Sequence, residues 1–463
     1  MASILVERSE AASWRSRAST LLLGGLQSPW LIVSLVLFAA HVWLVRSVIQ
    51  NGDGAVYNEQ IEQRIVGMRT THVGYVLCGI AAHALSPFDT DGTMNAVCLA
   101  FAAAGGAAAF MIARSLGASR PVAAVAPLMA FGIHAYLRGA VLAEVDVVAS
   151  SLILVAVALW LRGEVAKAGL AFGAAMLVTP VTAMSLPMLL LTTREPRNAP
   201  RRWSTHLRDV AVFGAVSLAA YMPLVLAFWH DYWNGGRGLL HAPRETWSVA
   251  HQVDRSIQFL TSSAGSWLAL GAGALVAGIP TGTPPSLGVF AALVMTATVG
   301  ERFLDVPVQL PQLCVLATLV VVLVGRLPTS WLRGGVLASL WLSTAWPTYR
   351  NVSDEVRADV EKREAYRAMT EQTPKMILAG VRDGWDDGLP FERVAYGRTK
   401  LGLGLSYRDL RSKASSIAET RRDYAIWLLG APPEGAMAAF AHRWRPEKRN
   451  VRGVDYEVWV PAG

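Results

Sequence analysis

The first residues able to do chemistry follow the first long apolar run, in the segment NGDGAVYNEQIEQRIVGMRTTHVGYVLCG, residues 51–79. Asp53 comes a few residues after that run, and His72 lies further along. Ionisable groups at the edge of a membrane core are costly, and they usually mark a substrate or ion site. A carboxylate at this depth can take a proton from an acceptor group, which contributes about 10²- to 10⁴-fold to the rate of a transfer step. Asp53 is therefore the candidate general base.

A second segment, HAYLRGAVLAEVDVV, residues 134–148, places Arg138 and Glu144 at a similar depth. Asp53 and Glu144 form a candidate ligand pair for Mg²⁺ or Mn²⁺, although two carboxylates are a small ligand set. Arg138 is a candidate for binding an anion such as a phosphate, because arginine forks match phosphate oxygens. A longer segment after residue 229 adds further candidates for substrate binding: Arg237, His241 and Arg244.

Each of these residues also has a plain structural interpretation. The sequence NGDG is a good turn, so Asp53 can be a capping residue, and Glu144 can cap the following helix. His72 can be an interfacial histidine, and the basic residues after 229 can belong to a solvated loop. The segment with Glu59, Glu62 and Arg64 fits an amphipathic interfacial helix, and we interpret its polar face as solvated.

Composition defines the class of protein that carries these residues. Hydrophobic residues make up 53% of the 463 residues and charged residues only 16%, which is below the quarter typical of soluble domains. The formal charge of +8 does not indicate a nucleic-acid partner, because the charges fall between apolar runs. The sequence therefore predicts an α-helical polytopic membrane protein.

About 20 apolar residues cross a bilayer core, and nine segments fit a full crossing. The predicted spans lie at residues 29–48, 93–113, 121–137, 147–161, 210–229, 264–279, 285–300, 311–325 and 331–346.

Two further apolar pieces are not counted as full spans. HVGYVLCGIAAHALSP is short, and we predict an interfacial helix there. The piece at residues 167–196 is interrupted by Pro180, and we predict a re-entrant hairpin, because the basic loop that follows then stays on the cytoplasmic side. This topology places the N-terminus in the cytoplasm and the C-terminus outside.

Three regions follow from this topology: a cytoplasmic segment 1–28, a transmembrane domain 29–349 and an extracytoplasmic domain 350–463. In the last region, DEVRADVEKREAYRAMTEQ predicts an exposed helix, while KMILAGV and YAIWLLG predict buried strands. A helix at PPEGAMAAFAHRWR followed by a strand at VDYEVWVPA would complete an αβ pattern, so we predict a small α/β domain.

Three short elements together resemble the GT-C superfamily of polytopic glycosyltransferases, in particular its protein O-mannosyltransferase-like branch. They are DGAVY at Asp53 to Tyr57, THVGYVL at Thr71 to Leu77, and AEVDVV from Ala143. Their order and spacing agree with that branch over the first 210 residues or so. The chain departs from the pattern in lacking both prolines of the HPPGYPL-type element and in keeping one aspartate in place of a pair.

The resemblance implies an inverting transferase that takes a sugar from a polyprenyl-phosphate carrier to a protein, lipid or glycan acceptor. It implies Asp53 as catalytic residue, with Tyr57, His72 and Tyr75 in the substrate site, and no required metal. We expect membrane lipid to surround the chain. The composition is typical of a high-GC bacterium, so we expect the bacterial inner membrane.

Two other classes of function fit part of the pattern. Broken helices and buried charges also occur in transporters and flippases, but here the charges cluster at the outer edge, and no second half repeats the broken helix. The reduced motif also fits a GT-C-like scaffold subunit without activity. In that case, loss of Asp53 would leave function unchanged.

Overall fold

The computed structural model describes residues 29–46, 52–66, 72–190, 203–230, 306–327, 329–382, 388–398 and 401–462. The chain divides into two compact units. The first contains residues 1–43, 98–140 and 145–350, and the second contains residues 44–97, 141–144 and 351–463.

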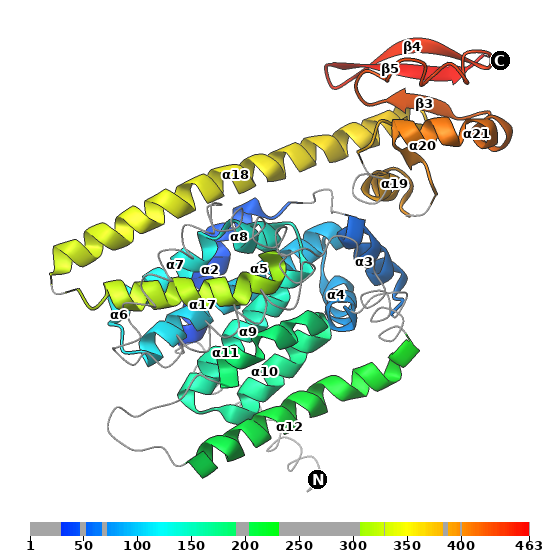
Figure 1. Ribbon diagram of the computed structural model, residues 1–463. Helices are drawn as coiled ribbons and strands as arrows, with labels where there is room; N and C mark the ends of the chain where they lie inside the picture. The colour runs from blue at the N-terminus through cyan, green and yellow to red at the C-terminus, as the bar shows by residue number, and fades with distance from the viewer. Residues whose placement is uncertain are drawn as a thin grey trace, which may run out of the picture. The chain divides into compact units, whose positions relative to one another are not determined.

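The first unit is helical in its described part (Figure 1). Its elements are α2 (Pro29–His41), most of α5 (Thr90–Ser115), α6 (Arg120–Ala123), α7 (Val125–Phe131), α8 (His134–Val141), α9 (Val145–Arg162), α10 (Val165–Val178), η2 (Pro180–Ser185), α11 (Leu186–Leu190), α12 (Trp203–Ala227), α17 (Val306–Val324) and the first half of α18 (Ser330–Gln372). A short 3₁₀ turn, η1 (Val42–Leu44), follows α2.

Helix α10 packs against both α9 and α12 (Figure 1). Two glycines on α10 allow the close approach of α12. A Cβ added at Gly169 would lie 2.7 Å from the Phe213 carbonyl oxygen, and one at Gly173 would lie 2.6 Å from that of Ser217. The Ser217 hydroxyl also donates to the Gly169 carbonyl oxygen at 3.0 Å. Small residues at such spacing let membrane helices pack backbone to backbone.

Among the described residues, three helices are long and apolar enough to cross a membrane: Thr90–Ser115, Val145–Arg162 and Ser204–Ala227. They match three predicted spans and fit an integral membrane protein. The predicted span 121–137 differs, because Arg120–Phe131 and His134–Val141 form a pair bent by 71°. The spans predicted at 264–279 and 285–300 lie outside the described residues, so the count of nine stays a prediction.

The predicted break at Pro180 is present. Helix α10 ends at Val178, Thr179 is extended with φ −151° and ψ 119°, and η2 begins at Pro180. Proline lacks the amide hydrogen that would continue the helix, and it pushes the preceding residue out of helical geometry. Whether the broken segment re-enters the membrane stays a prediction.

The second unit contains a five-stranded sheet ordered β2-β1-β3-β5-β4. Strands β1 (Met376–Ala379), β2 (Gly404–Leu405) and β3 (Ala425–Leu428) are parallel, while β4 (Trp444–Val451) and β5 (Val454–Pro461) form an antiparallel hairpin on β3. Helices α19 (Leu389–Tyr396), α20 (Tyr407–Ser412) and α21 (Ala414–Thr420) complete it. The hydrophobic core includes buried side chains of β1 and β3 together with Phe391 and Phe440.

The two buried strands that the sequence predicts are present as β1 and β3. The helix predicted at PPEGAMAAFAHRWR is wrong, because residues 434–443 form successive turns and β4 begins at Trp444. The strand predicted at VDYEVWVPA is present as β5. Gly435 adopts φ +72°, which a helix interior does not accommodate. Turns therefore stand directly after the two prolines, where the sequence predicts a helix.

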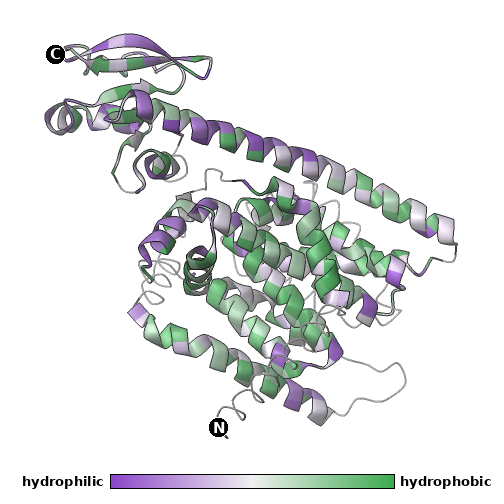
Figure 2. Cartoon of the chain, turned by 180° about the vertical axis from the view of Figure 1, so that it is seen from behind, coloured by the Kyte–Doolittle hydropathy of each residue, from purple (hydrophilic) through white to green (hydrophobic). Residues whose placement is uncertain are grey.

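The second unit also includes segments from the first part of the chain: α3 (Gly52–Gln63), α4 (Val73–Leu85) and the first turns of α5. The predicted C-terminal domain therefore forms one compact unit with the charged segment 51–79. Helix α18 runs for 43 residues without a break, joining the predicted span to the predicted exposed helix. Figure 2 shows its hydropathy changing from apolar to hydrophilic along its length.

Candidate functional site

The candidate base, Asp53, lies in the first turn of helix α3. The structure describes its backbone but not its side chain. Acidic residues are favoured in the first turn of a helix, where the amide groups carry partial positive charge. A carboxylate at this position fits both the capping interpretation and the functional one. The role of Asp53 therefore stays a prediction.

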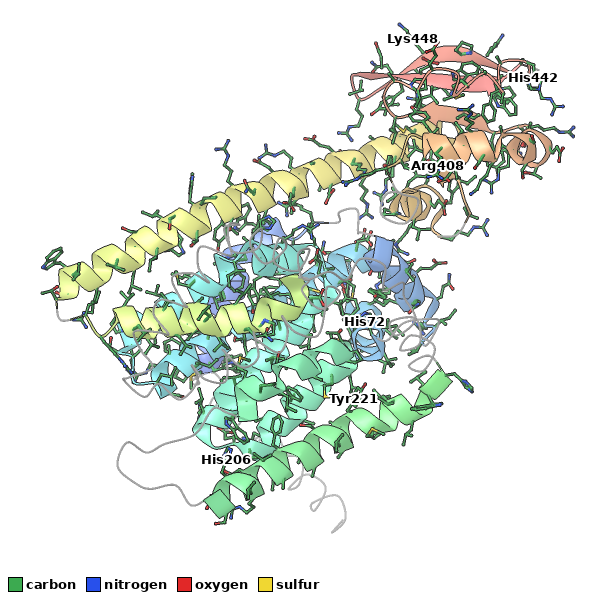
Figure 3. All side chains as sticks on the ribbon, viewed as in Figure 1. His72, His206, Tyr221, Arg408, His442 and Lys448 are labelled. Atoms are coloured by element: carbon green, nitrogen blue, oxygen red, sulfur yellow. The ribbon has the colours of Figure 1, made fainter. Side chains whose placement is uncertain are left out.

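Three aromatic side chains of the motif meet between α3 and α4. The ring of Tyr57 lies 5.4 Å from that of His72 and 5.7 Å from that of Tyr75, both in edge-to-face geometry. Tyr57 and Tyr75 are buried. His72 is half-buried and stands at the start of α4, without a side-chain bond that caps the helix (Figure 3). The DGAVY and THVGYVL elements therefore contact each other.

The third motif element joins this aromatic group through one hydrogen bond. The Tyr75 hydroxyl donates to the Ala143 carbonyl oxygen at 2.7 Å. Ala143 has φ +53°, in the left-handed region that alanine rarely occupies. Such backbone strain costs about 1–3 kcal/mol and persists where the surroundings hold it. Glu144, the next residue, is half-buried and belongs to the same unit.

The grouping of the remaining predicted substrate residues is not tested by the structure. Arg138 is half-buried on α8, in the first unit. Arg237, His241 and Arg244 lie outside the described residues. Their grouping with Asp53 stays a prediction.

The predicted metal site is also untested. Among the described residues, no group of three His, Cys, Asp or Glu side chains is placed to hold a metal ion. The carboxylate of Asp53 lies outside the described part of the chain, so the predicted pair with Glu144 stays a prediction.

An apolar groove of about 520 Å³ lies within the first unit, between α6–α7 and the start of α18. Val125, Leu128 and Leu337 line it, with Arg333 as its charged residue. Ser119 and Ser330 also line it, and the predicted topology places both on the cytoplasmic side. The groove is therefore not assigned to the predicted site, which lies on the outer side in that topology.

A second group of charged residues in the same unit was missed by the sequence interpretation. Glu62 on α3 and Asp91 in the first turn of α5 contact Arg393 of the C-terminal region, at 2.5 and 3.7 Å. Glu62 is 38% exposed, which agrees with the predicted solvated face, but it also forms an ion pair that the sequence interpretation did not include. Asp91 follows a turn, and its sequence context resembles an ordinary helix start. Its partners lie hundreds of residues away, so no local signal identifies them.

The comparisons with known proteins rest on structure alone. No protein-family model matches the chain, and no curated protein matches it. Among solved structures, ArnT from Cupriavidus metallidurans in the apo state superposes with a TM-score of 0.62, at 14% identity, covering 96% of this chain and 98% of that one. The same protein bound to undecaprenyl phosphate gives a TM-score of 0.60, also at 14% identity, over 94% and 98%.

The chain has the GT-C fold. The oligosaccharyltransferase from Archaeoglobus fulgidus, in complex with Zn and sulfate, superposes with a TM-score of 0.56, at 12% identity, over 93% of this chain and 73% of that one. Its form tethered to an acceptor peptide gives 0.52, at 11% identity, over 94% and 74%. The predicted GT-C resemblance is thus confirmed at the level of the fold. Nothing in it selects the O-mannosyltransferase-like branch.

Proposed function

We propose that this GT-C chain is a membrane-embedded inverting glycosyltransferase that moves a sugar from a polyprenyl-phosphate carrier to an acceptor on the outer face of the membrane. The main observation in support is the superposition on ArnT, which covers 96% of this chain and 98% of that one. Both the membrane part and the C-terminal domain of this chain fall within it. ArnT has also been solved with undecaprenyl phosphate, which is a polyprenyl phosphate.

The arrangement of the motif supports the proposal. Tyr57, His72 and Tyr75 form one group beside Ala143, so three elements that are distant in sequence meet in one unit. Asp53 precedes Tyr57 by one turn of the same helix. Asp53 therefore shares a helix with one member of the aromatic group, and aromatic side chains commonly line ligand sites.

The proposed reaction is a single displacement at the anomeric carbon. The acceptor hydroxyl or amine attacks that carbon and Asp53 takes its proton, while the bond from the anomeric carbon to the phosphate oxygen breaks. The products are the glycosylated acceptor and the free polyprenyl phosphate. Arg138 and the basic residues after 229 would balance the phosphate charge. The acceptor is a protein, a lipid or a glycan, and peptide is the class found with the oligosaccharyltransferase.

The proposal includes no required metal. The oligosaccharyltransferase was crystallised with Zn, and Mg²⁺ or Mn²⁺ bound by Asp53 and Glu144 is the alternative for this chain. Washing membranes with EDTA and then adding back each ion distinguishes the two. We expect transfer to persist after the wash; a loss that Mn²⁺ or Mg²⁺ reverses assigns the carboxylates to a metal.

The deciding experiment is the glycan and glycolipid composition of cells that lack this gene. We expect the wild-type chain to restore a missing sugar. Asp53→Asn at matched protein level should restore it about 10²- to 10⁴-fold more slowly, because it cannot accept the proton. Glu59→Gln is a matched control on the same helix. Its carboxylate accepts a bond from Gln63 at 3.1 Å, and we expect full restoration.

Three outcomes contradict parts of the proposal. If the wild-type chain restores no sugar, the enzyme function is wrong, and a transporter or scaffold takes its place. If Asp53→Asn restores the sugar fully, Asp53 is not the base. If Glu59→Gln fails as badly as Asp53→Asn, the assay reports the integrity of helix α3 and the catalytic assignment loses its support.

A further inference from the structure

Ion pairs connect the C-terminal domain to the segment that carries Asp53, all within the second unit. Arg363 on α18 contacts Asp89 at 2.8 Å and Asp91 at 3.0 Å. Arg393 on α19 contacts Glu62 through two nitrogens, at 2.5 and 3.1 Å. Each guanidinium therefore serves two carboxylates, since Arg393 also lies 3.7 Å from Asp91.

The two arginines and Asp91 are shielded from solvent, whereas Glu62 and Asp89 are 38% and 41% exposed. The side chains of Arg363, Arg393 and Asp91 are only 7%, 9% and 9% exposed. Bringing charges out of water is costly, and the cost is recovered only where the geometry is good and the remaining polar atoms are bonded. The catalytic proposal does not use any of these residues.

This group of charged residues contacts helix α3 at two positions one turn apart. Asn58 is 1% exposed, and its amide donates to the Asp91 carboxylate at 2.5 Å. Glu62, four residues later, binds Arg393 and accepts from the Thr90 hydroxyl at 2.7 Å. Residues four apart share one face of a helix. The contacts therefore fix both the rotation of α3 and its position along its axis.

The two arginines themselves stand on ordered elements. Arg393 follows Glu392, whose buried carboxylate accepts from the amides of Leu401, Leu403 and Gly404 at 2.9, 2.6 and 3.1 Å. Arg363 lies within the long helix α18. Side chains on such supports hold their partners more closely than side chains on loops.

We propose that Arg363 and Arg393 are positioning residues, and that the C-terminal domain orients helix α3, and with it Asp53, for sugar transfer. This inference rests on the proposed function for its catalytic part. Its structural part, the holding of α3 by two arginines from the other end of the chain, stands by itself. A displacement of about 1 Å in a reacting group can cost about a hundredfold in rate.

The structural part is tested by amide hydrogen exchange on the purified full-length protein in lipid nanodiscs. We expect Arg393→Gln to speed exchange of peptides from residues 52–63 by about tenfold or more, while strands β1 and β3 keep their protection. Arg393→Lys should give an intermediate rate, because it keeps the charge but loses the fork. The matched control is Lys375→Gln, which removes an exposed pair with Asp423, 2.6 Å long, and should leave α3 unchanged.

The catalytic part is tested with the same variants in the cells that lack the gene. At matched protein levels, we expect Arg393→Gln to slow the return of the missing sugar about a hundredfold, with partial recovery in Arg393→Lys. Unchanged exchange of α3 in Arg393→Gln overturns the inference. Faster exchange with a normal rate of sugar return overturns the positioning role. If the wild-type chain restores no sugar, the proposed function fails, while the exchange data still decide whether the arginines hold α3.

Discussion

At the scale of single residues, the contact between Tyr75 and Ala143 joins two motif elements with one hydroxyl. Tyr75→Phe would keep the ring contact with Tyr57 and leave the buried Ala143 carbonyl oxygen without this donor. We expect a loss of about 1–3 kcal/mol in the free energy of unfolding, the cost of a buried polar group left unbonded. Thermal unfolding in detergent measures it. A change below about 0.5 kcal/mol would mean that water replaces the hydroxyl.

Glu392 is the second residue whose role depends on a few atoms. Its buried carboxylate accepts three backbone amides between Leu401 and Gly404. Glu392→Gln places an amide group among those donors, so we expect a loss of about 2–3 kcal/mol, typical of bonds to a charged group. Glu434→Gln, at an exposed position, should stay within about 0.5 kcal/mol of the wild type. Equal losses in chemical denaturation would contradict the role of Glu392.

At the scale of elements, the packing of α10 on α12 gives a direct test. Gly173→Ala adds a Cβ that would meet the Ser217 carbonyl oxygen at 2.6 Å and the Ala220 Cβ at 2.8 Å. Alanine favours a helix over glycine by up to about 1 kcal/mol, but the contact forces two backbones apart, and overpacking costs about 1–3 kcal/mol. We expect a net loss of stability, measured by thermal unfolding in detergent.

Gly214 on α12 is the matched control, because nothing lies within 4 Å of a Cβ added there. We expect Gly214→Ala to be neutral or to stabilise the helix by up to about 1 kcal/mol. If both glycine variants gain stability, the approach of α10 and α12 is looser than the structure indicates.

Elements were predictable from sequence where one local rule decides them. Pro180 ends a helix wherever it occurs, and the apolar runs of β1 and β3 are bounded by turn residues, so these features were recognised. The bend between α7 and α8 was not, because Gly132 in an apolar run also fits a straight span. The segment before β4 was misinterpreted for a similar reason: its alanines favour a helix, but Gly435 adopts a left-handed turn.

At the scale of the whole molecule, the two units share helices α5 and α18 instead of a linker. The predicted boundary at residue 350 falls inside α18. Sequence could not reveal that residues 44–97 group with the C-terminal domain. The ion pairs of Arg363 and Arg393 span 274 and 331 residues, and charges so far apart carry no mutual signal. The three GT-C-like elements could be recognised because each is short and local.

Because residues 44–97 form one unit with residues 351–463, removing the C-terminal domain should affect both segments. A chain ending at residue 350 keeps the predicted transmembrane domain but leaves Glu62, Asp89 and Asp91 without their arginines. Asp91 is only 9% exposed, and leaving a buried charge without its partner costs about 3–5 kcal/mol. We expect this chain to be more sensitive to protease within residues 44–97 and to restore no sugar in cells. A truncated chain that restores the sugar would show that the C-terminal domain is dispensable.

Strand β4 has a consequence for how this domain meets other molecules. It is the outer strand of the sheet, carries Pro446, and bears exposed basic side chains, among them Lys448 (Figure 3). Proline and charge on an outer strand hinder pairing with a strand from another chain. The hairpin therefore resists edge-to-edge aggregation with other chains. A peptide that docks on this edge would be recognised through its side chains, and strand addition would be disfavoured.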